Sequence, residues 1–189
     1  MRIIAGDGAH VPSMNERRIV IIGFMGSGKT TVAEALAQRL GCAMIDLDSF
    51  ITKQEGRTPA EIIEHDGEAA FREIETLQLR HLLEKTDPRV IALGGGSWTM
   101  KINREMITRY QGLTVWLDAP FELCWQRIQG ISVNGDRVRP LAPDRESARQ
   151  LYERRRASYG LAAFKVNLGG NEDADMVAAK IQTWIESLG

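Results

Sequence analysis

The segment from Gly23 to Thr30, Gly-Phe-Met-Gly-Ser-Gly-Lys-Thr, combines residue types and a spacing that suit phosphate binding. It fits the pattern G-x-x-x-x-G-K-[S/T], and it lies between an apolar run and an amphipathic stretch, the strand–loop–helix context that the pattern requires. Glycines let successive backbone N–H groups face phosphate oxygens, and the start of the next helix adds partial positive charge. We therefore expect Lys29 to contact the β- and γ-phosphates of ATP and Thr30 to bind Mg²⁺. The residues expected to hold the nucleotide here are Gly26, Ser27, Gly28, Lys29, Thr30 and Thr31.

This loop alone does not identify the reaction, because GTPases, motor ATPases and small-molecule kinases all contain it. A GTPase would need an N-K-x-D sequence to recognise guanine, and the chain has none. With 189 residues there is also no room for the added modules of a large ATPase. A compact kinase is favoured.

Two aspartates, Asp46 and Asp48, end the second expected strand, residues 43–48. Residues two apart project to the same side of a strand, so both carboxylates are expected at one place. Asp46 could orient a magnesium-bound water, and Asp48 could accept a hydrogen bond from a substrate hydroxyl, as a base or a positioning group. The alternative is that one of them caps a helix that begins at Ser49. Asp118 is a weaker magnesium candidate than Asp46, because it too suits a helix cap.

Two arginines are candidates for binding an anionic substrate. Arg72 and Glu75 lie three residues apart on an expected helix, where they form either an ordinary solvated ion pair or an arginine held towards a substrate carboxylate. Arg155 falls on an inward stripe with Ala148, Tyr152 and others, whereas Arg154 does not. An arginine on such a stripe either extends to solvent or pairs with an anion, and we favour the anion.

Three consecutive glycines, Gly94, Gly95 and Gly96, follow the third expected strand directly. Glycines cost backbone entropy, so a run of three suits a place where a ligand touches the backbone better than it suits a plain turn.

Short β-branched runs alternate with helical patterns along the chain, which predicts a parallel sheet covered by helices on both faces. The expected fold is therefore a three-layer α/β/α arrangement with a five-stranded parallel sheet, in which ligands bind beyond the carboxyl ends of the strands. The expected strands are residues 18–23, 43–48, 89–93, 113–117 and 164–168. The expected helices are residues 29–40, 59–85 with a break near Asp66, 101–110, 120–129, 145–160 and 173–188.

Residues 130–144 carry two glycines, two prolines and the arginines Arg137 and Arg139, without a helical or strand pattern. A loop of this length in a compact domain is usually functional, so we expect a mobile lid. Residues 1–16 are expected to be an N-terminal extension, and residues 17–189 a single domain.

The formal net charge of −1 provides no field for binding nucleic acid or an anionic membrane surface. No apolar run is long enough to span a membrane, and the first residues lack the apolar stretch of a signal peptide. The two cysteines, Cys42 and Cys124, are expected to be buried thiols in a reducing compartment. We expect a monomeric cytoplasmic protein.

Taken together, the motifs resemble those of the shikimate kinase family over about residues 18–166. The resemblance rests on G-F-M-G-S-G-K-T, D-L-D at 46–48, G-R-T at 56–58, G-E-A-A-F-R-E-I-E at 67–75, L-G-G-G at 93–96, R-V-R-P-L at 137–141 and R-R-A-S-Y at 155–159. It implies a P-loop kinase fold and phosphoryl transfer from ATP to shikimate with Mg²⁺.

The resemblance also implies roles for individual residues. Thr30 and Asp46 would serve the magnesium ion, and Asp48 would contact the shikimate hydroxyls. Arg72 and Arg155 would bind its carboxylate, with backbone contacts from the glycines at 94–96. Arg139 would bridge the phosphates of the two substrates, and Arg127 would lie along the adenine. The catalytic residues would be Lys29, Asp48 and Arg139.

Two other functions remain open from the residues. A kinase of another small carboxylated polyol, such as gluconate, would share the phosphate loop but would not need the F-R-x-x-E and G-G-G motifs. A non-catalytic ATP-binding module would not need to keep Lys29, Asp48 and Arg139.

Overall fold

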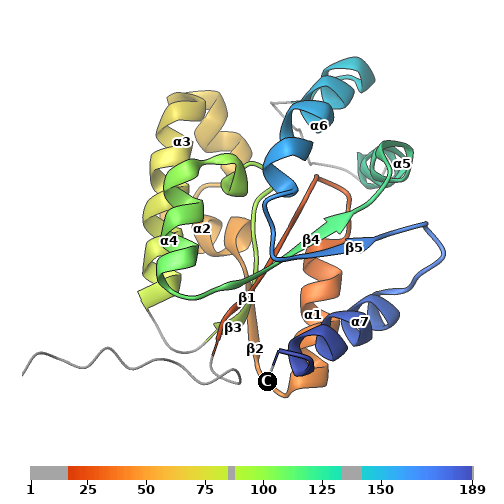
Figure 1. The fold of residues 1–189 in the computed structure, drawn as a ribbon. Coiled ribbons are helices and arrows are strands. Elements are labelled where there is room, and N and C mark those ends of the chain that lie inside the picture. Colours follow the sequence, from red (N-terminus) through yellow and green to blue (C-terminus); the bar gives the residue numbers. More distant parts are fainter. Residues whose placement is uncertain (1–16, 85–87, 133–141, 189) are drawn as a thin grey trace, which may run out of the picture.

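A five-stranded parallel sheet forms the centre of the molecule in the computed structural model, which describes residues 17–84, 88–132 and 142–188 (Figure 1). The strand order is β2-β3-β1-β4-β5, and every pair of neighbours is parallel. The strands are β1 (Ile19–Gly23), β2 (Ala43–Asp46), β3 (Pro88–Ala92), β4 (Leu113–Asp118) and β5 (Phe164–Asn167). The expected three-layer fold is thus confirmed.

Helices cover both faces of the sheet, with α1 and α7 packed together on one side and α3 and α4 packed together on the other (Figure 1). The helices are α1 (Lys29–Leu40), α2 (Leu47–Glu55), α3 (Pro59–Glu84), α4 (Lys101–Arg109), α5 (Phe121–Ser132), α6 (Arg145–Tyr159) and α7 (Ala174–Glu186), with a 3₁₀ turn, η1 (Ser97–Thr99). None of the helices in the described ranges is long and apolar enough to cross a membrane.

The central strand explains why the sheet is parallel and covered. All five residues of β1 are buried, and four of them are isoleucine or valine. Both faces of this strand must therefore be apolar, as in a sheet with helices on each side. The carboxyl ends of β1, β2 and β3 lie at the same edge, so the segments that follow them converge.

One expectation about the second strand is wrong. Strand β2 ends at Asp46, and α2 begins at Leu47, so Asp48 lies in the first turn of a helix and not on a strand. Asp46 is the N-cap residue of α2, and its carboxylate accepts a hydrogen bond from the backbone N–H of Ser49 at 3.0 Å. Helix capping outweighed strand continuation here, because a β-region N-cap with a carboxylate satisfies otherwise unpaired N–H groups.

The other expected elements agree with the structure within a few residues. The break near Asp66 is present, since Gly67 has φ 87° and ψ 162° within α3. Helix α5 extends to Ser132, so the expected loop begins later than residue 130. Residues 1–16 and 133–141, which include Arg137 and Arg139, lie outside the described residues.

Candidate active site

The phosphate loop has the backbone conformation that anion binding requires. Gly26 and Gly28 have φ values of 76° and 92°, in the left-handed region where only glycine is unstrained. Gly28 is the N-cap of α1 and has no side chain to cap the helix, so the first N–H groups remain available to a ligand. The buried hydroxyl of Ser27 has no hydrogen-bond partner among the described residues. This loop can therefore hold an anion at the start of α1.

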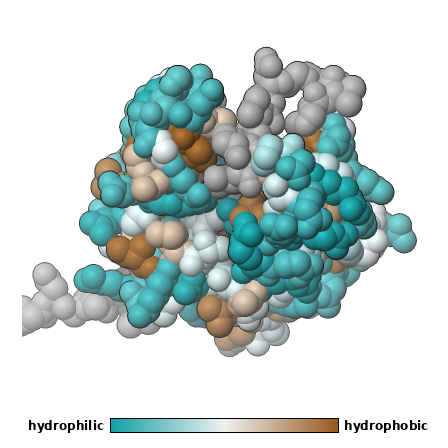
Figure 2. Space-filling model, turned by 90° about the horizontal axis from the view of Figure 1, so that it is seen from above, coloured by the Kyte–Doolittle hydropathy of each residue, from teal (hydrophilic) through white to brown (hydrophobic). Residues whose placement is uncertain are grey.

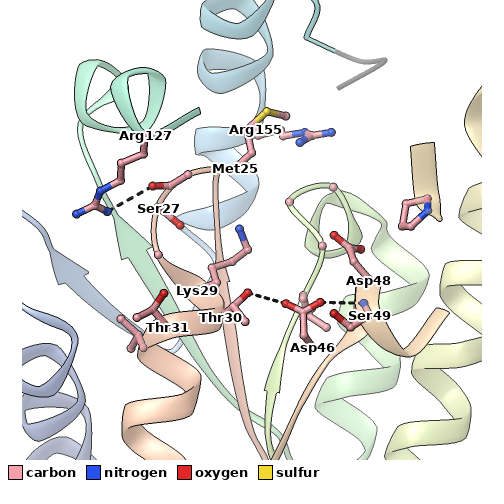
Figure 3. Close-up of a pocket in the computed structure, with 18 of the residues that line it drawn as sticks. Met25, Ser27, Lys29, Thr30, Thr31, Asp46, Asp48, Ser49, Arg127 and Arg155 are labelled. Carbon is pink, nitrogen blue, oxygen red and sulfur yellow. Dashed lines mark hydrogen bonds between the residues drawn. The ribbon is translucent and has the colours of Figure 1, made fainter. Parts of the chain in front are cut away.

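Lysine and threonine side chains follow the loop directly. Lys29 Nζ donates to the carbonyl oxygen of Phe24 at 2.9 Å, so it folds back over the loop. Thr30 Oγ1 donates to Asp46 Oδ2 at 2.6 Å, joining the start of α1 to the end of β2 (Figure 3). A hydroxyl beside a carboxylate is a donor set that suits Mg²⁺, which usually takes few protein ligands and completes its shell with phosphate and water.

Asp48 lies beside the three glycines that follow β3, residues 94–96, which we call the glycine segment. A Cβ atom on Gly94 would come within 2.7 Å of Asp48 Oδ1 and 2.8 Å of Glu75 Oε1. Only a glycine allows the backbone to approach both carboxylates this closely. Asp48 of α2 and Glu75 of α3 thus meet at Gly94, in the loop after β3, and form one acidic corner of the site.

Arg72 is held by two glutamates. Its Nη1 donates to Glu75 Oε2 at 2.7 Å, and its Nε and Nη2 donate to Glu68 Oε1 at 3.2 and 3.0 Å. The side chains of Arg72 and Glu75 are only 12% and 1% exposed, so this pair does not lie on a solvated face. Such a fixed guanidinium is suited to binding a planar carboxylate.

The carboxyl group of Glu75 is strongly perturbed. Its pKa is raised to about 7, chiefly by burial and to a smaller extent by the charge of Asp48, and against the lowering effects of Arg72 and Arg155. Glu75 Oε1 is buried without a hydrogen-bond partner among the described residues. A perturbed carboxyl in a cleft beside two arginines is typical of a functional site.

Arg155 enters the site from α6. It is 7% exposed, and burial lowers the pKa of its guanidinium. Its Nη1 lies 3.3 Å from where a Cβ on Gly95 would be. The neighbouring Tyr159 donates its hydroxyl to the carbonyl oxygen of Gly95, and burial raises the pKa of this tyrosine to about 12, so it remains a donor. The expected inward stripe is confirmed, with Arg154 exposed.

A single pocket of about 940 Å³ contains these groups. Figure 3 shows Lys29, Asp48 and Arg155 reaching towards the same space from α1, α2 and α6. The face of the molecule that is seen from above is mostly hydrophilic (Figure 2). Arg127 also borders the pocket, and its Nη1 donates to the carbonyl oxygen of Gly26 at 3.4 Å. The predicted site residues that line the pocket are Gly26, Ser27, Gly28, Lys29, Thr30, Thr31, Asp46, Asp48, Arg72, Gly94, Gly95, Gly96, Arg127 and Arg155.

Asp118 is engaged elsewhere. It forms ion pairs with Arg156 at 2.9 Å and Lys165 at 2.7 Å, and it is not among the residues that line the pocket. Both of these cations also lie over the ring of Trp116. The geometry supports ranking Asp46 above Asp118 as a magnesium candidate.

Two parts of the pocket wall were not predicted from the sequence. One is the start of α3 with Thr58 and Ile63, and the other runs from Leu168 to Val177 beside Arg127. Only Thr58 belongs to a motif, the G-R-T at 56–58, and no pocket role was assigned to it. The apolar and capping residues of the rest are of the same types as those found outside pockets. Asp173 could have indicated the second part, because it caps the helix that follows β5, and a helix that follows a parallel strand begins at the carboxyl edge of the sheet, where ligands bind.

Comparisons with known proteins agree with this geometry. The family model described as "Shikimate kinase" matches residues 25–186. A shikimate kinase from Cereibacter sphaeroides is 39% identical over 166 residues, which cover 86% of this chain and 80% of the relative. One from Geobacter sulfurreducens is 38% identical over 178 residues, 93% of each chain.

Solved structures give the same result. The shikimate kinase from Acinetobacter baumannii in complex with shikimate matches with a TM-score of 0.81 and 34% identity, covering 90% of this chain and 93% of that one. A gluconokinase from Sinorhizobium meliloti matches with a TM-score of 0.60 at 18% identity, covering 92% and 93%, a likeness of fold alone. The family match over residues 25–186 and the identities of the relatives together establish that this chain belongs to the shikimate kinase family.

Proposed function

We propose that this protein transfers the γ-phosphoryl group of ATP to a hydroxyl of shikimate, forming shikimate 3-phosphate for aromatic amino acid biosynthesis. The observation that carries the proposal is the joint placement of a phosphate loop and two inward arginines in one pocket. Family membership and the shikimate-bound relative support the choice of acceptor. The buried thiol of Cys124 and the half-buried thiol of Cys42, both free, suit a reducing compartment such as the cytoplasm.

The donor half of the pocket would bind the nucleotide. Backbone N–H groups at the start of α1 would hold the phosphates, and Lys29 would leave the Phe24 carbonyl to contact the β- and γ-phosphates. Mg²⁺, when bound beside Thr30 and Asp46, would neutralise charge on these phosphates. Arg127 would lie along the base.

The acceptor half would bind a small carboxylated polyol. Arg72 and Arg155 would bind the carboxylate, because the half-buried guanidinium of Arg72 and the buried one of Arg155 border the same glycine segment. Asp48 would accept the hydrogen bond of the hydroxyl that attacks the phosphorus, as a base or a positioning group. Arg139 remains a prediction for the closed state, outside the described residues.

An acceptor panel tests the proposal. Purified protein with ATP and Mg²⁺ is supplied separately with shikimate, gluconate and nucleoside monophosphates, and ADP release is followed by a coupled assay. We expect turnover with shikimate well above that with the other compounds, and turnover about 10²–10³-fold lower in Lys29→Ala. Preferred use of gluconate, or ATP binding without turnover, would contradict the proposal.

A further inference from the structure

Trp98 connects the glycine segment to the helix that carries Arg155. It lies in η1, two residues after Gly96, and is only 4% exposed. Its indole Nε1 donates to the carbonyl oxygen of Ser158 at 2.8 Å. Ser158 is in the last turn of α6, three residues after Arg155. The hydrogen bond therefore joins segments 60 residues apart in the chain, both of which border the acceptor half of the pocket.

A second hydrogen bond runs in the opposite direction between the same two segments. The hydroxyl of Tyr159 donates to the carbonyl oxygen of Gly95. In addition, α6 packs against η1 as a whole. The end of α6 is thus held to the glycine segment by one donor from each side, and Arg155 lies one turn before both of them.

The turn that carries Trp98 is itself fixed to α4. Arg104 Nη1 donates to the carbonyl oxygens of Trp98 and Thr99 at 2.9 and 2.7 Å, and the buried Asn103 Nδ2 donates to that of Ser97 at 3.0 Å. The backbone of η1 cannot shift without breaking these bonds. The hydrogen bond from the indole therefore attaches the end of α6 to a turn whose own position is fixed by α4.

Arg155 depends on the position of this turn because its side chain is buried and its guanidinium lies close to Gly95. Its Nη1 lies at 3.3 Å from the position of a Cβ on Gly95, so a small movement of α6 would displace the guanidinium from the glycine segment or press it against the backbone. Binding groups need placement within about 0.5 Å of the productive geometry.

We propose that Trp98 is a positioning residue for acceptor binding: its indole N–H, bonded to Ser158, holds Arg155 at the glycine segment in the orientation that receives the substrate carboxylate. The inference rests on the proposed function, in which Arg155 binds the carboxylate of shikimate. It concerns a residue that does not touch the substrate, and it assigns a role to the N–H group rather than to the bulk of the ring.

Trp98→Phe, which retains an aromatic ring but lacks the N–H, is the first variant. We expect the KM for shikimate to rise about three- to tenfold, the range that the loss of one neutral hydrogen bond produces, with kcat and the KM for ATP unchanged. Because phenylalanine is smaller, a second variant carries 3-benzothienylalanine at position 98, in which sulfur replaces the N–H of an otherwise equal ring. It should show the same rise in KM.

Trp184→Phe is the matched control, since Trp184 stacks on Phe164 with ring centroids 4.6 Å apart and belongs to α7. It should leave the KM for shikimate unchanged. An unchanged KM in the benzothienylalanine variant, or an equal rise in the KM values for shikimate and ATP, would overturn the proposal in favour of a general packing role.

The acceptor panel, run with the wild-type protein, distinguishes a failure of this inference from a failure of the proposed function. If the acceptor panel selects a different carboxylate, the proposed function fails, and the same comparison of KM values is made with that acid. If the accepted compound carries no carboxylate, or if no compound is turned over, both proposals fail.

Discussion

Replacing Gly96 by alanine would place one methyl group against Arg72. The backbone of Gly96, at φ −101° and ψ −18°, accepts alanine without strain. The added Cβ would overlap the Arg72 guanidinium, with Cζ and Nη1 each at 2.7 Å, whereas carbon contacts are favourable near 3.5–4.0 Å. Arg72 would therefore have to move by about 1 Å.

This displacement is expected to weaken acceptor binding more than folding. The end of an arginine side chain can move at little cost to the core, but Arg72 would lose alignment with Glu75, to which it donates at 2.7 Å. Hydrogen bonds to charged groups contribute about 1.5–3 kcal/mol, so the KM for shikimate should rise by about 10- to 150-fold. Steady-state kinetics with each substrate varied in turn would measure it, and the KM for ATP should stay constant.

Gly160→Ala is the matched control, because Gly160 has φ −61° and ψ −10°, and the first atom that an added Cβ would meet is the carbonyl oxygen of Ala157, at an ordinary contact distance of 3.5 Å. It should leave both KM values unchanged. If Gly96→Ala binds shikimate as the wild type does, the argument that Arg72 is held against the glycine segment for carboxylate binding is refuted. A large loss of Tm with equal damage to both KM values would refute it as well.

Three further results are expected. Lys29→Ala should lower kcat by about 10²–10³-fold while the circular dichroism spectrum is retained, because Lys29 would stabilise charge that develops on the transferred group; near wild-type kcat would contradict this role. Arg155→Ala should raise the KM for shikimate far more than that for ATP, whereas the exposed Arg154→Ala should change neither; equal effects of the two would show that burial on the inner face of α6 does not matter. Burial raises the pKa of Glu75 from 4.5 to about 7. The native state therefore keeps this proton at pH values where the unfolded chain has lost it. The resulting contribution to stability is complete below pH 4.5 and is lost as the pH rises through about 7. The Tm of the wild type relative to Glu75→Gln should therefore fall over that interval, and a difference independent of pH would argue that Glu75 is already ionised.

The phosphate loop could be predicted from the sequence because its function depends on consecutive residues. The glycines, Lys29 and Thr30 are placed by local backbone conformation and by the start of α1. The inward position of Arg155 also follows from local periodicity, since 3.6 residues per turn places it with Ala148 and Tyr152. The parallel sheet follows for a similar reason, because strands buried on both faces have continuous apolar runs.

Other parts of the site depend on contacts between distant segments. Asp48 was expected on a strand, but capping by Asp46 starts α2 and turns Asp48 towards Gly94. Whether Glu75 is solvated or buried, and so whether its pKa is ordinary or raised, depends on the elements packed around it.

The sequence by itself determined the chemistry of the donor half, the order of the strands and of the helices other than α2, and the residue types available for binding an anion. Only the tertiary structure decided which of these residues meet: that Arg72 lies against Gly96, that Asp48 and Glu75 share one corner, and that Trp98 bonds to Ser158. The physical reason is that local motifs depend on neighbouring residues and backbone periodicity, whereas burial, close approach and long-range hydrogen bonds arise only when the helices pack on the sheet.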